Sequence, residues 1–337
     1  MIIPFVDARE KAAPGHARQR RDQALAVRDA CLGWLPMGGL LARIADPLVR
    51  NWMRRSGSAY VDEIDAIART LRRPGVWLLH GAYLFGCTAL ADETAAGPRL
   101  RRTLDWPFPG LGRLVEVAHQ RGPAGAFLNV TWPGFVGVLT ASAPGRFAAS
   151  INQAPMRRRT RHAWLLWIDY VLNALGAITR GGRLPPEHLL RQVFEQCATF
   201  DEARRLLETT PVARPVLFVL VGCRTGERLV IERESTCARV YADETTAANN
   251  WRLPSDDWRP RACGEGTPVE NNRRRCTALS AWNGRDAQDF EWAAPPVLNA
   301  HTRLTVDMCP AEGTLKVAGW EADGRGSAHR VADQSKF

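Results

Sequence analysis

Hydrophobic residues in the first quarter of the chain recur at the spacing of an α-helix. Over residues 40–71 they fall at intervals of three and four positions, which places them on one helix face. The sequence Arg72-Arg-Pro-Gly75 interrupts this pattern, and it resumes over residues 76–85. A further helix is expected near residues 18–35. The pattern therefore predicts a helical N-terminal segment over residues 1–86.

After residue 86 the pattern changes to short apolar segments separated by glycine and proline, which is typical of β-strands joined by turns. Strands, then helices, then strands again indicate stacked layers of sheet and helix rather than alternating βαβ units. The expected strands cover residues 87–92, 100–105, 113–119, 126–132, 135–140, 146–152, 216–223, 228–232, 238–241, 303–309 and 314–318, and the expected helices cover residues 161–179, 186–198, 200–208 and 272–282.

The composition limits the class of protein. A chain of 337 residues with 45% apolar content is long enough for one large domain or two medium ones. The formal net charge is +10, but 42 of the 45 basic residues are arginine. This bias is more typical of genome base composition than of a nucleic-acid groove, so we expect no nucleic-acid partner. The arginine clusters at residues 18–21, 157–159 and 273–275 are interpreted as solvated surface, with weak contact to an anionic lipid surface as the alternative.

The eight cysteines indicate free thiols rather than a metal site. None of them forms a Cys-x-x-Cys pair or a zinc-like grouping with histidine. The sequence motifs of serine hydrolases, nucleotide-binding proteins and zinc peptidases do not occur either. The N-terminus lacks the order of a secretory signal, and the longest apolar stretch, residues 75–91, is short for a membrane span. We therefore expect a cytoplasmic protein without a cofactor or metal.

Cys87 has the most informative surroundings. It follows Gly86 and precedes a strand-like segment that leads to Arg102-Thr-Leu-Asp105-Trp106. If the Gly86–Cys87 bond is cut, Cys87 carries both a thiol and a free α-amine. That amine has a reference pKa of about 7.7–8.0 and can accept the proton of a thiol that otherwise titrates near pH 8.5. The alternative interpretation is a buried core cysteine next to a surface ion pair.

Short motifs follow one another in a fixed order along the chain. They are Tyr60-Val-Asp-Glu-Ile-Asp-Ala-Ile-Ala-Arg69, Gly86-Cys87-Thr88, Arg102-Thr-Leu-Asp105-Trp106, Gly134-Phe-Val-Gly-Val-Leu-Thr140, Gly145-Arg-Phe-Ala-Ala-Ser-Ile-Asn152, Thr246-Ala-Ala-Asn249-Asn250-Trp251 and Asn271-Asn-Arg-Arg274-Arg275-Cys-Thr-Ala278. Together they resemble the acid ceramidase and N-acylethanolamine acid amidase family, which is allied to the bile salt hydrolases and penicillin V acylases. The resemblance covers roughly residues 60–320.

The resemblance implies an α+β fold, the four-layer αββα sandwich of an N-terminal-nucleophile hydrolase made as a precursor. Autocatalytic cleavage would release residues 1–86 as a helical α-fragment and leave residues 87–337 as the catalytic β-fragment. The implied activity is hydrolysis of a linear amide through an S-acyl intermediate. The implied substrate is a small N-acyl amide with a fatty or aromatic acyl group.

The resemblance also implies roles for single residues around the cysteine. Cys87 would attack the amide carbonyl. Asp105 would orient the α-amine or the thiol of Cys87. Arg102 would keep Asp105 ionised and stabilise negative charge near the thiolate.

Two asparagines and a late arginine complete the expected site. Asn249 and, by family analogy, Asn152 would donate hydrogen bonds to the oxyanion of the tetrahedral intermediate. Arg274 or Arg275 would match the late arginine of the family, which supports the site or the substrate. As an alternative, both asparagines are turn residues.

Two other functions stay open at this point. The first is an acyltransferase on the same fold, which an added amine would reveal by intercepting the acyl-enzyme. The second is a non-catalytic protein that binds a lipid surface and has lost processing, since Asn152-Gln-Ala154 lacks an arginine that the family has there. Four tryptophans are candidates either for an acyl pocket or for ordinary packing: Trp106, Trp132, Trp164 and Trp167.

Overall fold

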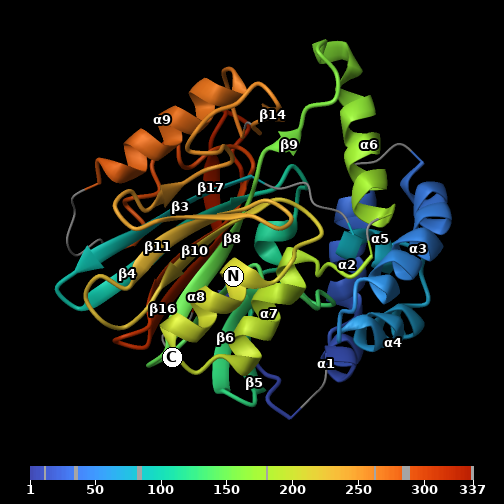
Figure 1. Cartoon of the computed structure of the whole chain (residues 1–337). Coiled ribbons are helices and arrows are strands. Elements are labelled where there is room, and N and C mark those ends of the chain that lie inside the picture. Colours follow the sequence, from blue (N-terminus) through green and yellow to red (C-terminus); the bar gives the residue numbers. More distant parts are fainter. Residues whose placement is uncertain are drawn as a thin grey trace.

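Two β-sheets packed face to face form the centre of the molecule (Figure 1). The computed structural model describes residues 1–10, 13–33, 37–81, 86–179, 181–261, 263–282 and 289–334. The first sheet has the order β1 (Ile2–Ile3), β17 (Ala328–Gln334), β16 (Thr314–Ala322), β15 (Thr302–Cys309), β4 (Gly97–Asp105), β3 (Gly86–Thr94) and β13 (Thr246–Ala247). The second has the order β12 (Ala238–Tyr241), β11 (Arg228–Arg233), β10 (Val216–Val221), β8 (Phe147–Gln153), β7 (Thr140–Ala143), β6 (Gly125–Thr131), β5 (Glu116–Gly122) and β2 (Phe5–Asp7).

Helices cover the outer face of each sheet. The second sheet is covered by α7 (Pro186–Gln196) and α8 (Phe200–Thr209), and the first by α9 (Pro268–Ser280). The N-cap threonines of α8 and α9 accept hydrogen bonds from the backbone three residues later. Because Thr267 provides this cap, α9 begins at Pro268 and not at the expected residue 272. This arrangement confirms the predicted α+β fold with αββα layers. In the described parts of the chain, no helix has the length and apolarity that crossing a membrane requires.

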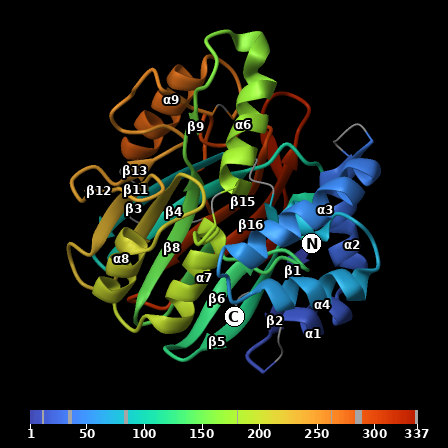
Figure 2. The ribbon, with the colours of Figure 1, turned by 45° about the vertical axis from the view of Figure 1, so that its right-hand side comes forward.

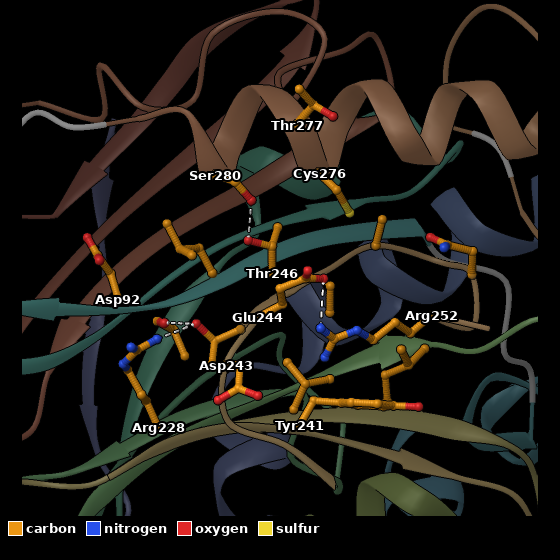
Figure 3. Close-up of a pocket in the computed structure, with 18 of the residues that line it drawn as sticks. Asp92, Arg228, Tyr241, Asp243, Glu244, Thr246, Arg252, Cys276, Thr277 and Ser280 are labelled. Carbon is orange, nitrogen blue, oxygen red and sulfur yellow. Dashed lines mark hydrogen bonds and ion pairs between the residues drawn. The ribbon is translucent and has the colours of Figure 1, made fainter. Parts of the chain in front are cut away.

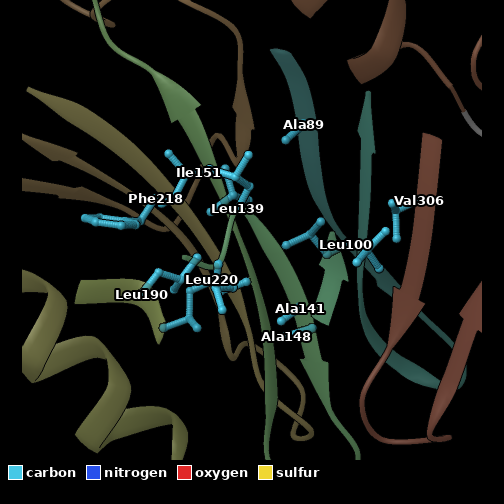
Figure 4. Packing of buried hydrophobic residues seen from close by; sticks show 14 of the residues in the cluster. Ala89, Leu100, Leu139, Ala141, Ala148, Ile151, Leu190, Phe218, Leu220 and Val306 are labelled. Atoms are coloured by element: carbon cyan, nitrogen blue, oxygen red, sulfur yellow. The ribbon is translucent and has the colours of Figure 1, made fainter. Parts of the chain in front are cut away.

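Small and branched residues fill the space between the two sheets (Figure 4). Every residue of β8, β10 and β15 is buried, as expected for strands with a covered face on each side. Ala89 and Ala91 of β3 are fully buried and lie on the same face of the strand as Cys87. The first sheet therefore presents short side chains to the second sheet beside that residue.

The segment that precedes β3 is mostly helical. It contains α1 (Ala13–Gln19), α2 (Arg21–Gly33), α3 (Gly38–Arg55), α4 (Val61–Leu71) and α5 (Val76–Gly81), which share a separate apolar cluster around Trp52, Ile64 and Trp77. Residues 82–85 of the expected last helix and residues 34–35 lie outside the described residues. The same segment also contributes an edge strand to each sheet, because β1 pairs in parallel with β17 and β2 with β5.

Some elements differ from the expected ones. The strand expected over residues 135–140 begins only at Thr140, because the backbone amides of Val136 and Val138 donate to His80 Nε2 and to the Glu187 carbonyl instead of to a neighbouring strand. A further strand, β17, follows the hairpin that was expected to close the chain. The helix expected over residues 161–179 is divided into η2 (Ala163–Leu165) and α6 (Leu166–Thr179), and α6 lies beside a small pair of strands, β9 (Met156–Arg157) and β14 (Trp258–Arg259).

Candidate active site

Cys87 is the second residue of β3 and is fully buried. Side chains alternate between the two faces of a strand, so Cys87 and Ala89 face the second sheet, whereas Gly86 and Thr88 face α9. The thiol lies 3.1 Å from Arg102 Nη2 and 3.6 Å from the carbonyl oxygen of Ile151 in β8. The nucleophile predicted from the sequence therefore lies between the sheets.

Arg102 fixes the thiol from the neighbouring strand. Its guanidinium is fully buried and donates to the carbonyl oxygens of Leu139, at 2.9 Å, and Ile151, at 2.8 Å. In the β3–β4 register Arg102 is opposite Ala89, and Asp105 is opposite Gly86, so the two side chains point to opposite faces. The expected pairing of Arg102 with Asp105 is wrong for this reason, and Arg102 instead acts directly on the thiol.

Asp105 has its partners on the face toward α9. Its Oδ1 accepts a hydrogen bond from the Thr302 hydroxyl at 2.8 Å, and its Oδ2 lies 3.6 Å from Arg275 Nη1. Arg275 is fully buried and donates from the same Nη1 to the carbonyl oxygen of Cys87 and to Thr88 Oγ1, both at 2.7 Å. Arg274, the other candidate for the late arginine, is exposed on α9, and the structure does not bring it to this cluster.

Asn249 joins the start of β3 to the rest of the site. Its Oδ1 accepts hydrogen bonds from the backbone amide of Cys87 at 2.9 Å and from Arg275 Nη2 at 3.0 Å. Its Nδ2 donates to the carbonyl oxygen of Gln153 in the second sheet at 2.8 Å. Asn249 therefore spans both sheets beside the Gly86–Cys87 bond, which is not the behaviour of a simple turn residue.

Asn152 holds the segment that carries Asn249. Its Nδ2 donates to the carbonyl oxygens of Ala247 and Ala248, at 3.0 and 3.3 Å. Its Oδ1 is buried and has no hydrogen-bond partner. The side chain thus supports the position of Asn249 and has one free acceptor within the site.

Two further asparagines complete the network, and sequence reasoning did not select them. Asn271 Oδ1 accepts from Arg275 Nε at 3.0 Å, and Asn272 Oδ1 accepts from Arg275 Nη2 at 2.7 Å and from the backbone amide of Asn249 at 2.9 Å. Residues three and four positions apart share one helix face, so the spacing of these asparagines from Arg275 was a usable signal. They fix the orientation of the arginine.

Burial raises the pKa of the Cys87 thiol, while the charge of Arg102 and its hydrogen bond to the sulfur oppose that increase. Arg102, Arg275 and Asp105 together carry one net positive charge in a buried volume. This positive charge offsets part of the cost of burying a thiolate or an oxyanion, because a buried charge is costly unless an opposite charge compensates it. The arrangement is therefore suited to developing negative charge at Cys87.

A hollow of the site region lies at the open edge of the sandwich and not at Cys87 (Figure 3). It has a volume of about 750 Å³, and β3, β11, β12, β13 and α9 surround it. Ala247, Ala248 and Asn250 line this hollow, whereas Asn249 between them contacts the Cys87 amide. The structure thus separates Asn249, which faces the cysteine, from Asn250, which faces the hollow. In the described parts of the chain, no three His, Cys, Asp or Glu side chains are grouped as metal ligands would be.

Curated proteins of two kinds are similar to the chain. Acid ceramidase of Heterocephalus glaber is 29% identical over 204 residues, which are 58% of this chain and 48% of that protein. N-acylethanolamine-hydrolyzing acid amidase of Caenorhabditis elegans is 24% identical over 238 residues, which are 67% of this chain and 61% of that protein. Over these regions the chain is similar to both kinds of enzyme.

The extent of these matches is limited. The matched region spans about half of the acid ceramidase. No model of a known protein family matches the chain. The solved structure of the Caenorhabditis elegans N-acylethanolamine-hydrolyzing acid amidase ortholog covers 68% of this chain and 93% of its own, with a TM-score of 0.48 and 21% identity.

Proposed function

We propose that the chain is the precursor of an N-terminal-nucleophile amide hydrolase and that it cuts its own Gly86–Cys87 bond. The observation that carries this proposal is the set of hydrogen bonds around Cys87. Its amide is held by Asn249, its carbonyl by Arg275 and its thiol by Arg102, at hydrogen-bond distances and in full burial. Any buried residue needs partners for its amide and carbonyl, but at Cys87 polar side chains provide both, and a buried arginine also donates to the sulfur.

The cut proceeds by transfer of the Gly86 acyl group. The Cys87 sulfur attacks the carbonyl carbon of Gly86, the C–N bond breaks, and the thiol proton goes to the departing nitrogen. Water then hydrolyses the thioester, which leaves a carboxylate on Gly86 and a free thiol and α-amine on Cys87. Residues 1–86 become the α-fragment and residues 87–337 the catalytic β-fragment.

Hydrolysis of a substrate amide repeats this chemistry with the new terminus. The α-amine of Cys87 accepts the thiol proton, the thiolate attacks the acyl carbon, and the same amine returns the proton to the leaving nitrogen. Water then hydrolyses the thioester, which releases the carboxylic acid and restores the thiol. Asn249 donates to the oxyanion from Nδ2, and Asn152 supports it. Asp105 and Arg275, on the α9 side of the strand, hold the main chain of Cys87 in position.

The substrate that we propose is a linear N-acyl amide with a fatty or aromatic acyl group. The relatives are named for ceramide and N-acylethanolamine chemistry, and both names refer to such amides. A fatty acyl group also fits a protein with large exposed apolar side chains on α3 and α6.

We also propose weak contact with a lipid surface, made by α3 and α6. These helices contact each other on one side of the molecule, as Figure 2 shows. Large apolar side chains project from both helices and from η2, which directly precedes α6, including Ile44 at 60% exposure, Trp164 at 74% and Trp167 at 62%. A helix as apolar as α6 is normally buried, and the exposed Arg159 and Arg161 beside it would favour an anionic interface.

Acyl-enzyme trapping tests the hydrolase proposal. The purified chain is incubated with N-lauroylethanolamine, quenched in acid, and its β-fragment is weighed by mass spectrometry. We expect the fragment to gain one lauroyl group and free laurate to accumulate, and we expect neither from Cys87→Ala. Conversion of the lauroyl group into a new amide when hydroxylamine or another amine is added, without release of laurate in water, would indicate an acyltransferase. Absence of both products would support the non-catalytic lipid-binding alternative.

A further inference from the structure

Gly86, the residue before the nucleophile, is in contact with a second cysteine. A Cβ atom built on Gly86 would lie 1.5 Å from Cys263 Sγ, 3.1 Å from Cys263 Cβ and 3.4 Å from Asn249 Oδ1. The φ angle of Gly86 is outside the left-handed region, so the backbone conformation itself does not require glycine. Glycine is required here only by the close approach of Cys263.

Cys263 is held firmly in that position. Its backbone amide donates to Asn271 Oδ1 and its carbonyl accepts from Asn271 Nδ2, both at 3.1 Å, and it is 4% exposed. The same Asn271 oxygen accepts from Arg275 Nε, and Arg275 donates to the carbonyl of Cys87. One connected set of contacts therefore holds the atoms on both sides of the Gly86–Cys87 bond.

The thiol of Cys263 is an uncharged packing group. Burial raises its pKa to about 12, so it stays protonated at neutral pH. It faces Gly86 from the α9 side of β3, whereas the Cys87 thiol lies on the side of the second sheet. The two cysteines thus border the same peptide unit from opposite faces.

We propose that Cys263 is a positioning residue for the cut, and that its sulfur takes the space of a side chain at position 86 and so restricts that position to glycine. This inference rests on the proposed self-cleavage. A side chain at position 86 would have to displace either the sulfur or the start of β3. A displacement of about 1 Å in a reacting group can cost about 10²-fold in rate.

The contact between Gly86 and Cys263 predicts that Cys263→Ala restores the rate of the cut that Gly86→Ala lowers. In Gly86→Ala the new methyl group overlaps the sulfur, and we expect the cut to slow by about 10²-fold or more. In Gly86→Ala/Cys263→Ala the sulfur is gone and the nearest atom is the Cβ at 3.1 Å, a distance that a shift of a few tenths of an ångström relieves. We expect the double variant to cut within about tenfold of the wild-type rate, on the same rate scale.

The rates are measured on full-length protein by following the two fragments over time after synthesis. Gly39→Ala is the matched control, because no atom lies within 4 Å of a Cβ built there, and it should cut at the wild-type rate. The thermal stability of Gly86→Ala is measured with and without Cys263→Ala in a Cys87→Ala background, which cannot cut. We expect Cys263→Ala to recover the stability that Gly86→Ala loses.

Different failures have different meanings. A Gly86→Ala chain that cuts at the wild-type rate would overturn the pairing alone. The pairing would also be overturned if Gly86→Ala/Cys263→Ala cut as slowly as Gly86→Ala while the same two substitutions left the Cys87→Ala chain as stable as before. A wild-type chain that is never cut would overturn the proposed function and this inference together.

Discussion

At the scale of single residues, each polar atom of Cys87 has its own partner. Asn249 holds the amide, Arg275 the carbonyl and Arg102 the sulfur. After the cut, the amide becomes an amine and stays next to Asn249 and the Asp105–Arg275 pair. The roles of these groups are separable, because they lie on different faces of one strand.

Replacement of Asp105 tests the role of the Asp105–Arg275 pair. Asp105→Asn keeps the shape of the side chain but removes the negative charge beside Arg275. The positive charge of Arg275, which holds the Cys87 carbonyl, then has no opposite charge from residue 105. We expect kcat to fall by about 10²-fold or more. Asp92→Asn is the control, because Asp92 pairs with Arg101 on the same two strands. Activity of Asp105→Asn within about threefold of wild type would return this pair to a structural role.

The two neighbouring asparagines give a second prediction. Asn249→Ala removes a donor that is used mainly in the transition state, so we expect kcat per cut enzyme to fall by about 10²–10³-fold with little change in KM. Asn250 donates to the carbonyl of Trp251 and lines the hollow, and Asn250→Ala should be far milder. If steady-state kinetics show the reverse order, the oxyanion donor is Asn250.

The sequence predicts the site only as far as its motifs reach. Cys87, Arg102, Asp105 and Asn249 occur in family order and could be selected without coordinates. Their pairing could not, because it depends on strand register, which places Arg102 and Asp105 on opposite faces. Cys263 has no sequence signal at all, since its role depends on the close approach to Gly86.

At the scale of elements, the apolar surface of α3 and α6 predicts binding to vesicles. Each exposed tryptophan can bury about 150–250 Å², and Arg159 and Arg161 add attraction to anionic lipid. Trp164→Ser/Trp167→Ser should weaken co-sedimentation with phosphatidylglycerol-containing vesicles by at least about tenfold. Val269→Ser on α9, at a residue 60% exposed, is the control and should bind normally. Equal binding by the double variant and the wild type would contradict the proposal.

His80 of α5 links the N-terminal segment to the catalytic domain and predicts a pH dependence. It lies 2.8 Å from the carbonyl oxygen of Val76 through Nδ1, and Nε2 accepts the Val136 amide at 3.1 Å, so the ring is neutral. Burial lowers its pKa from 6.5 to about 4. The unfolded chain therefore binds more protons in this range, and stability falls as the pH drops from about 6.5 to 4.

The variant His80→Gln measures that contribution. Glutamine keeps a donor and an acceptor but does not titrate, so between pH 7 and 4 the variant should lose about 3 kcal/mol less unfolding free energy than the parent. Urea unfolding at several pH values, in a Cys87→Ala background, gives the change of unfolding free energy with pH for the variant and for its parent. His162→Gln, at an exposed histidine, should leave the pH dependence as it is. Identical slopes for His80→Gln and its parent would show that this histidine does not couple stability to pH.

Long periodic elements were predictable, and short ones were not. The helices at residues 38–55 and 61–71 follow their apolar spacing. Strands β1 and β2 have two and three residues, too few for a pattern, and exist because free sheet edges accept them. Residues 135–139 have the sequence pattern of a strand, yet the amides of Val136 and Val138 donate to a histidine and to a helix carbonyl.

At the scale of the whole molecule, the segment before the cut is interwoven with the catalytic domain. It places one strand at the edge of each sheet, and its helices share a core with Val136 of the catalytic domain. We therefore expect the two fragments to stay associated after cleavage, rather than the first to be released. The cytoplasmic location expected from the sequence stays a prediction.

The central claim is that Cys87 becomes a chain terminus, and the mass of the purified protein under denaturing conditions tests it most directly. We expect two species from the wild-type chain, residues 1–86 and residues 87–337, and a single species from Cys87→Ala. A wild-type chain that hydrolyses amides at full rate while its mass remains that of the intact 337 residues would contradict it.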